Sequence, residues 1–587
     1  MPQQYLNQVL PIFSWIKHYT RKNVADDFMA GSIVAIILIP QSMAYAMLAG
    51  LPPQLGLYSS VVPLMLYTFF GSSRALAVGP VGLVSLMTGA TLIKLAPQNE
   101  QEVINISVTL ALMTGIILLA IRAAKLSAIT KFLSHPVMSG FTSAAAIMIM
   151  LSQVKHLIGI DLPSDPNALI TIGSIFEHLS QANIAALFIG FSGITLLLYI
   201  RKPLGLFLKS KGIGTPASRN ALSRCGPFFL AVIGIVFTWL LSLHEVFALS
   251  IVGAIPSGLP GLSLPQTQWS LIIQLLPSAL LIAIIGFFES VSVAKSLASR
   301  KRERINADQE ALALGVANIG ASFSSGMPVA GGFARSIVNF SSGATSPMSG
   351  FISGLFVAFS LLFLLDIIYY LPRAILAAII CVAVTGLIDW RAMHEAWVYN
   401  KADAAALIIT FVCVLVFGIE PGILAGVLYS IGQYLHRSSK PHIAVVGRVG
   451  NSEHYRNIER HQVMTHEKIL LLRIDESLYF ANTNYLEVNM INLIADNPKV
   501  SDVVIICSAV NFIDTSAIQS LETIAFLLKK ANIKLHYAEI KGPIMDRLIK
   551  SNVIENICTG NIFLSTHDAM LELTDTIETR NKPKAAA

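Results

Sequence analysis

SSGMPVAGGFARSIVNFSSGATSP, residues 324–347, places an arginine inside an apolar segment that glycine and proline interrupt. A guanidinium at the centre of a bilayer costs at least about 3 kcal/mol, so Arg335 is expected to face protein or water. The break that begins at Pro328 predicts a short helix over Ala334 to Phe340 with free N–H groups at its start. Free N–H groups beside a fixed cation predict an anion site, although a glycine hinge with a structural arginine has the same pattern.

The composition indicates a polytopic membrane protein, so the lipid bilayer is one of its expected partners. Hydrophobic residues form 54% of 587 and charged residues 13%, against averages of about 45–50% and 25%. The five cysteines lack metal-ligand spacing, and the chain has no nucleotide loop or nucleophile–base set, so we expect no metal, no cofactor and no enzyme activity. The net charge of +7 lies largely in short loops, which indicates membrane orientation and not nucleic acid.

Hydropathy predicts fourteen membrane segments, two of which are half-helices. Glycine and proline precede both half-helices, at Gly79 and Pro80 and again near residue 331, about 250 residues later, as expected of an internal repeat. The predicted segments are 28–50, 56–70, 81–92, 105–122, 132–155, 181–200, 226–244, 271–294, 309–325, 334–340, 348–366, 368–388, 403–419 and 421–435.

Basic loops predict the orientation of these segments. Lys and Arg gather at 122–131, 201–224 and 295–304, which should therefore be cytoplasmic. Residues 1–27 are too polar for a cleaved signal peptide and are expected to form a cytoplasmic segment. An even number of crossings would leave both termini in the cytoplasm.

A soluble α/β domain is expected after residue 436, where apolar runs shrink to strand length. Strands are predicted at 468–474, 502–507 and 533–540, and helices at 516–530 and 543–550. The predicted domains are a transmembrane domain at 28–436, the α/β domain at 437–575 and a disordered tail at 576–587.

Motifs along nearly the whole chain resemble the SulP sulfate permeases and related solute-carrier anion transporters. Pro53 to Arg74, PQLGLYSSVVPLMLYTFFGSSR, is similar to the family signature, with departures at Leu55 and Met65. Further matches are VGPVGLVSL, LSHPVMSGF, ESVSVAKSLASR, GGFARSIVN and VGRVGNSEHYRN. SLYFAN and NFIDTSAIQSLE resemble the STAS domain that the family carries.

The resemblance implies two inverted seven-segment repeats, with a core domain that moves against a gate domain. It places the substrate between the half-helices that start near Gly79 and Pro80 and near Ala334 and Arg335. It also implies a homodimer, with a possible cytoplasmic protein partner for the STAS domain.

Polar residues near the two breaks are candidates for substrate contact. The hydroxyls of Ser85, Thr88 and Ser336 are expected either to donate to an anion or to allow close helix packing. Gln41 and Tyr45 lie about one turn apart and are expected to line a cavity or to pack in the core.

Glu289 is the candidate proton carrier, because it is the only acidic residue between Glu245 and Glu303. A carboxyl beside an anion site is able to exchange a proton as substrate comes and goes. The alternative is a permanent ion pair with Arg335 or Lys295.

In the C-terminal domain, Asp514, Thr515 and Ser516 resemble the strand-to-helix corner that receives a phosphate in bacterial STAS regulators. Ser516 is therefore a regulatory candidate, with a simple helix N-cap as the favoured alternative.

Taken together, residues and resemblance predict a secondary active transporter in a bacterial inner membrane that couples sulfate uptake to protons. The alternatives are a bicarbonate, dicarboxylate or chloride carrier or exchanger, or a membrane anion sensor that signals through the STAS domain.

Overall fold

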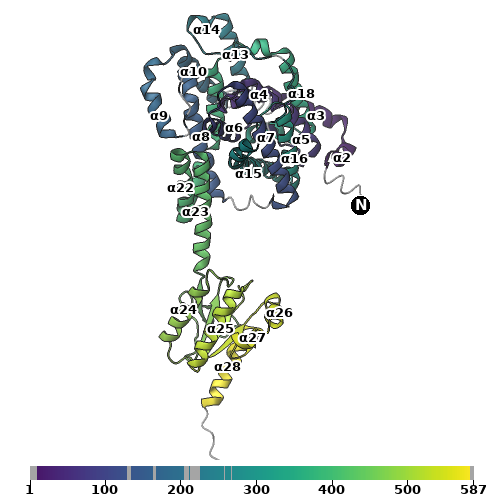
Figure 1. Ribbon diagram of the computed structural model, residues 1–587. Helices are drawn as coiled ribbons and strands as arrows, with labels where there is room; N and C mark the ends of the chain where they lie inside the picture. Colours follow the sequence, from purple (N-terminus) through teal and green to yellow (C-terminus); the bar gives the residue numbers. More distant parts are fainter. Residues whose placement is uncertain are drawn as a thin grey trace, which may run out of the picture. The chain divides into compact units, whose positions relative to one another are not determined.

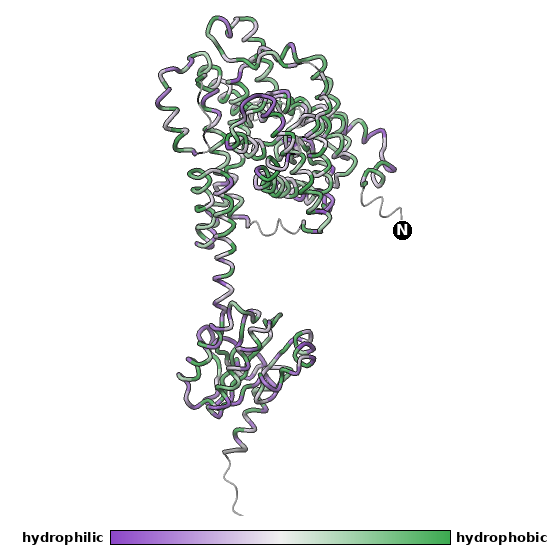
Figure 2. Tube along the Cα trace, viewed as in Figure 1, coloured by the Kyte–Doolittle hydropathy of each residue, from purple (hydrophilic) through white to green (hydrophobic). Residues whose placement is uncertain are grey.

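The chain folds into two units, Met1–Ser430 and Ile431–Ala587 (Figure 1). The computed structural model describes residues 10–127, 134–160, 162, 165, 167–201, 203, 210–211, 225–256, 258–265 and 268–581. Most of the basic loop predicted at 201–224, together with Lys131, lies outside the described residues. Hydrophobic residues dominate the helices of the first unit, whereas the second unit mixes hydrophobic and hydrophilic residues (Figure 2).

The described part of the first unit consists of helices and one pair of two-residue strands. The strands are β1 (Val78–Gly79) and β2 (Ala330–Gly331). The helices are α2 (Ile12–Trp15), α3 (Arg21–Leu48), α4 (Pro53–Tyr58), α5 (Val62–Phe70), α6 (Gly82–Leu95), α7 (Glu100–Ala123), α8 (His135–Ile158), α9 (Ala168–Glu177), α10 (Ile184–Arg201), α13 (Gly226–Leu240), α14 (Leu243–Val246), α15 (Trp269–Arg300), α16 (Ala307–Phe323), α17 (Phe333–Ser341), α18 (Met348–Phe363), α19 (Leu365–Ile368), α20 (Arg373–Val384), α21 (Trp390–Tyr399), α22 (Lys401–Phe417) and α23 (Ile419–Ser439), which runs into the second unit.

Several of these helices have the length and hydropathy of a bilayer span. Five helical stretches of the described chain qualify by themselves: Arg21–Leu48, Glu100–Ala123, His135–Ile158, Trp269–Arg300 and Arg373–Tyr399. Shorter apolar helices, α6 and α18 among them, accompany these spans. The number of crossings, fourteen in the sequence analysis, stays a prediction.

Several helices depart from the predicted segments. The segment predicted at 56–70 is two helices, because Ser59 and Ser60 turn inward to bond other segments and Pro63 opens the second helix. Helices α9 and α21 were not predicted, and α20 begins five residues later than expected, directly after Pro372. Helix α3 starts at Arg21, inside the segment expected to precede the membrane domain.

A buried carboxylate ties α5 to α16. Glu310, in the first turn of α16, is fully buried. Its Oε1 accepts hydrogen bonds from the Ser72 N–H (2.9 Å), the Ser72 hydroxyl (2.6 Å) and the Ser73 N–H (3.0 Å), and its Oε2 accepts one from the Tyr67 hydroxyl (2.8 Å). One side chain thus satisfies the backbone of the loop that leads from α5 into the β1 break.

The second unit is a six-stranded sheet with helices on both faces. The strand order is β4-β3-β5-β6-β7-β8; β3 runs antiparallel to both its neighbours, and the pairs from β5 to β8 are parallel. The strands are β3 (Ile443–Arg448), β4 (Tyr455–Asn457), β5 (Ile469–Ile474), β6 (Asp502–Ile506), β7 (Lys534–Ala538) and β8 (Ile562–Phe563), and the helices are α24 (Thr483–Asp496), α25 (Thr515–Lys530), α26 (Gly542–Lys550), α27 (Ile554–Ile557) and α28 (Thr566–Asn581).

The three predicted strands and two predicted helices of this unit are confirmed to within two residues at every end. Alternate residues of β5 pack on opposite faces: Leu470 and Leu472 face the helices α24 and α25, while Ile469 and Leu471 face α28. The disordered tail predicted from residue 576 is wrong up to Asn581, because Ile577 is buried against the sheet and extends α28. Residues 582–587 lie outside the described residues.

Removal of the buried carboxylate should destabilise the first unit. Glu310→Ala leaves several buried donors without an acceptor and should cost about 3 kcal/mol of unfolding free energy. Glu310→Gln keeps one carbonyl oxygen for the Ser72 and Ser73 donors and should cost about 1 kcal/mol. Thermal unfolding of the purified protein in detergent measures both; equal midpoints for the two variants would show that the bonds to Glu310 do not hold the loop.

Candidate functional site

Two interrupted chain segments cross in the first unit. Strand β1 pairs with β2 in antiparallel register, Val78 opposite Gly331 and Gly79 opposite Ala330. Each strand leads within three residues into a half-helix, α6 from Gly82 and α17 from Phe333. The predicted half-helix starts, Val81 and Ala334, each lie one residue from the observed ones. The crossing therefore holds two helix N-termini, whose unpaired N–H groups carry partial positive charge.

Side chains from three helices or helix ends satisfy the backbone of the second break. Ser59 accepts a hydrogen bond from the Met327 N–H (2.7 Å). Asn318 accepts one from the Val329 N–H and donates one to the Val329 carbonyl, both at 2.9 Å. Ser290 accepts one from the Gly331 N–H (2.8 Å). Irregular backbone at membrane depth requires such partners, because lipid supplies none.

The sequence analysis did not single out these three side chains. The available signal was the isolated polar residue in an apolar span: Ser290 and Asn318 are fully buried within α15 and α16.

Arg335 joins the two breaks. It lies in the first turn of α17 with 2% of its surface exposed, and its Nη1 donates to the Pro80 carbonyl at 2.6 Å. Among the described residues, its Nε and Nη2 have no hydrogen-bond partner. The guanidinium is thus held by one bond and keeps N–H groups for a ligand.

Two glycines make room for this guanidinium. Gly79 has φ +153°, a conformation that residues with a side chain rarely adopt. At Gly332 a Cβ atom would lie 2.9 Å from Nη2 of Arg335, too close for van der Waals contact. Gly79 and Gly332, which belong to the two predicted chain breaks, therefore also let the backbone approach the Arg335 guanidinium.

A cavity of about 520 Å³ lies at the crossing. Its lining includes four polar side chains among the described residues, and all four were site candidates in the sequence analysis: Gln41, Tyr45, Glu289 and Arg335. Gln41 is 6% exposed. Gly82 and Ala334, at the starts of the two half-helices, also line the cavity.

Glu289 reaches the cavity from α15 without an ion pair. No salt bridge joins it to Arg335 or Lys295 within the residues that the structure describes, and its Oε2 has no hydrogen-bond partner there. The permanent ion pair considered as the alternative is absent from this conformation of the described chain.

The hydroxyl candidates lie behind the cavity wall. Ser336 donates to the Gly332 carbonyl (2.7 Å) and accepts from the Ala77 N–H (2.9 Å), so its proton is already used. Thr88 donates to the Val84 carbonyl (2.9 Å). Ser85 is fully buried, and its hydroxyl has no partner among the described residues, yet it does not line the cavity. Ser336 therefore positions backbone at the crossing, and its expected role as a free donor is not what this conformation offers.

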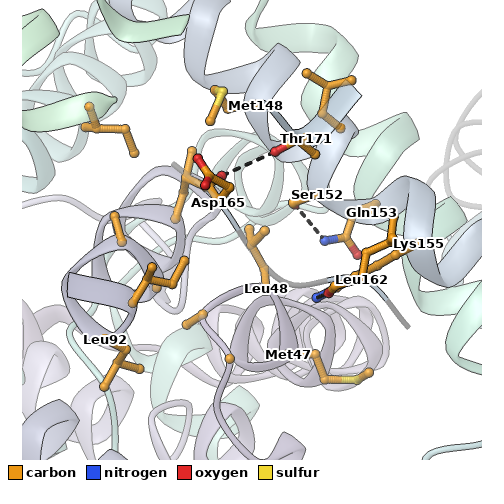
Figure 3. A pocket seen from close by; sticks show the side chains of 18 of the residues that line it. Met47, Leu48, Leu92, Met148, Ser152, Gln153, Lys155, Leu162, Asp165 and Thr171 are labelled. Carbon is orange, nitrogen blue, oxygen red and sulfur yellow. Dashed lines mark hydrogen bonds between the residues drawn. The ribbon is translucent and has the colours of Figure 1, made fainter. Parts of the chain in front are cut away.

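A second cavity, of about 360 Å³, lies near the other end of α6 (Figure 3). Apolar side chains such as Met47, Leu92 and Met148 form much of its wall. Its polar groups bond one another, as when Gln153 donates to the Ser152 hydroxyl (3.1 Å). The predicted site residues line the first cavity, not this one.

In the second unit, Ser516 is not the cap of α25. Helix α25 begins at Thr515, and Asp514 is its N-cap, with Oδ1 accepting from the Ala517 N–H (2.8 Å) and Oδ2 from the Phe480 N–H (2.9 Å). The N-cap reading of Ser516 is wrong, because the carboxylate one residue before the helix takes that place. A regulatory role for Ser516 stays a prediction.

A multi-pass helical unit with two crossed half-helices belongs to an architecture used by secondary transporters. The chain matches the Sulfate permease family over residues 24–410 and the STAS domain over residues 460–569. This chain is a member of the sulfate permease family and carries a C-terminal STAS domain. The fold class expected from the sequence, a polytopic helical membrane protein with an α/β STAS domain, is confirmed.

Relatives in plants align with nearly the whole chain. Sulfate transporter 4.1, chloroplastic, of Arabidopsis thaliana is 35% identical over 589 residues, which covers 98% of this chain and 84% of the relative. Sulfate transporter 3.2 of the same plant is 32% identical over 582 residues, covering 96% and 88%.

Solved structures share the fold at lower identity. The structure of SLC26A9 superposes with a TM-score of 0.88 at 22% identity and covers 99% of this chain and 95% of that chain. The transmembrane domain of the cyanobacterium bicarbonate transporter BicA has a TM-score of 0.58 at 20% identity and covers 70% of this chain and 99% of that one.

Proposed function

We propose that this protein is a secondary active transporter that takes up sulfate with protons and holds the anion between the N-termini of α6 and α17. The observation that carries the proposal is Arg335, a buried guanidinium with unpaired N–H groups at the edge of a 520 Å³ cavity. The relatives named as sulfate transporters support the choice of anion.

The charge of the site suits a divalent oxyanion. Each helix N-terminus contributes about half a positive charge, and Arg335 contributes one more, which gives about two in all. A planar guanidinium makes two parallel hydrogen bonds to an oxyanion, a contact that suits a tetrahedral anion as well as a carboxylate. The Tyr45 hydroxyl and the Gln41 amide add neutral donors on the same wall.

Protonation of Glu289 changes the net charge of the site and so couples proton binding to anion binding. An ionised Glu289 cancels about one of the two positive charges, so a bound dianion would leave the site with excess negative charge. Protonation of Glu289 removes that excess, so binding of sulfate and binding of a proton favour each other. The unpaired Oε2 of Glu289 is compatible with a group that gains and loses a proton.

The two walls of the cavity differ in a way that suits alternating access. The polar side chains come from α3, α15 and α17, whereas α10, α13 and α20 contribute apolar groups such as Leu197, Pro227 and Ile379. An apolar wall binds no anion of its own, so the polar wall is able to move past it with substrate attached. In this proposal α3, α6, α15 and α17 belong to the moving core, the basic loops face the cytoplasm, and two copies form a dimer.

Loss of the guanidinium should abolish sulfate binding without unfolding the protein. Arg335→Ala removes the one full positive charge of the site, and Arg335→Lys should restore little, because an ammonium lacks the two-point contact. Binding of radiolabelled sulfate to purified protein in detergent, with thermal unfolding as the folding control, measures this. Wild-type affinity in the alanine variant would contradict the proposal.

Glu289→Gln should separate transport from the proton gradient. Wild-type protein in proteoliposomes should concentrate radiolabelled sulfate when the outside is acidic, with or without sodium. The variant mimics the protonated carrier, so it should still bind sulfate and exchange it across the membrane, but it should not accumulate it.

Thermal unfolding is the control in this experiment. Glu289→Gln should unfold at the wild-type temperature, because Glu289 forms no ion pair among the described residues. A variant that is stable and still concentrates sulfate in response to acid would remove Glu289 from the coupling. Wild-type protein that ignores the gradient would remove proton symport altogether.

A further inference from the structure

One motif of the chain has no part in the transport site. Residues 446–457, VGRVGNSEHYRN, form the end of β3, a turn and β4, at the edge of the STAS sheet. Gly447 pairs with Arg456 and Val446 with Asn457 in the antiparallel register of these strands. The motif thus places Arg456 and the buried Asn457 next to each other in β4, the edge strand of the sheet.

A pocket of about 360 Å³ lies beside this asparagine. Its other lining residues are all charged or titratable: Arg456, Arg460, Arg473, His442, His461 and Asp475. No aliphatic residue and no Phe, Tyr or Trp is among the described residues that line the pocket, so charged and polar groups dominate recognition there. The lining contains three arginines and a single carboxylate.

The carboxylate of Asp475 already accepts hydrogen bonds from two neighbouring side chains. Asp475 accepts hydrogen bonds from Nε (2.6 Å) and Nη2 (3.0 Å) of Arg473 and from Nδ1 of His442 (2.8 Å). Partial burial raises the pKa of the Asp475 carboxyl, but the bonds from Arg473 and His442 outweigh it and hold the pKa below its usual value. Asp475 therefore stays ionised, orients Arg473 and leaves the other two arginines without compensation.

Asn457, the last residue of β4, fixes the turn that carries Arg460 and His461. Its carbonyl accepts hydrogen bonds from the N–H groups of Arg460 (3.2 Å) and His461 (3.1 Å), and its Oδ1 accepts one from the Glu459 N–H (2.8 Å). Within the described part of the chain, no hydrogen bond or ion pair is formed by the side chains of Arg456 and Arg460. Hydrogen bonds to Asn457 order the turn, while the guanidinium groups of Arg456 and Arg460 stay free for a ligand.

We propose that this pocket of the STAS domain binds a compact, multiply charged oxyanion of the phosphate class. Arg456 on the edge strand β4, Arg460 on the ordered turn after it and Arg473 oriented by Asp475 form a set of planar donors, the arrangement that recognises phosphate oxygens. Because the described lining consists of charged, titratable and amide side chains, it favours the charged group itself over an attached apolar ring or chain. The site is separate from the sulfate cavity and does not depend on the proposed transport function.

Calorimetric titration of the full-length protein in detergent with pyrophosphate tests the site. The Arg335→Ala background removes the membrane cavity as a competing anion site. Arg456→Ala combined with Arg460→Ala should weaken pyrophosphate binding about tenfold or more, since two charge-assisted contacts are lost. Added KCl should also weaken binding to the parent protein, because the cations are exposed.

Arg547→Ala is the matched control, an exposed arginine on α26 outside the pocket, and it should leave the affinity unchanged. Nanodiscs with and without phosphatidic acid distinguish the source of the ligand: unchanged affinity for pyrophosphate indicates a soluble ligand, and reduced affinity indicates a lipid headgroup in the same pocket. Absence of pyrophosphate binding, or equal affinity in the double variant and the Arg547→Ala control, would overturn the proposal.

Discussion

The bond from Arg335 to the Pro80 carbonyl is the interaction on which the membrane unit's site depends. It ties the first turn of one half-helix to a residue two positions before the other, beside two paired strands of only two residues each. A cation is buried at this point because both chain breaks have glycine where the guanidinium passes. The same bond uses one N–H group of Arg335 and leaves others free, so structure and ligand binding share one side chain.

Interrupting two helices inside a membrane leaves backbone N–H and C=O groups without helical partners, and nearby side chains supply hydrogen bonds to them. Ser59, Asn318 and Ser290 satisfy backbone N–H groups of every second residue from Met327 to Gly331, and Ser336 bonds the backbone of both breaks. Glu310 does the same for the loop before the first break. Each bond stands in for one that a continuous helix would have made, and for which the bilayer offers no substitute.

The sequence predicted the two half-helices well because glycine and proline act locally on the backbone. It also predicted the four polar residues of the cavity, since a polar side chain in an apolar span needs a polar surrounding. It failed where the outcome depends on partners distant in the chain: the bonds of Ser59 and Ser60 divide a helix predicted to be continuous, and bonds at Ser336 use the hydroxyl expected to be free.

Other misses have different physical causes. Helix α21 exposes Trp390, Trp397 and Tyr399, residue types of a membrane interface, and so lacks the apolar length that hydropathy detects. Helix α28 is polar apart from a stripe that includes Leu573 and Ile577, and it is helical because that stripe covers the sheet. The cap at Asp514 was missed because Ser516, two residues further on, is also a residue type that favours the N-cap position.

The most direct measurement of the central claim is a pair of cryo-electron microscopy maps of the protein in nanodiscs, one with saturating sulfate and one without. The account predicts added density in the cavity at the crossing, in contact with the guanidinium of Arg335 and the backbone N–H groups that begin α6 and α17. Sulfate density elsewhere in the membrane unit, or a saturated protein with an unchanged crossing, would contradict it.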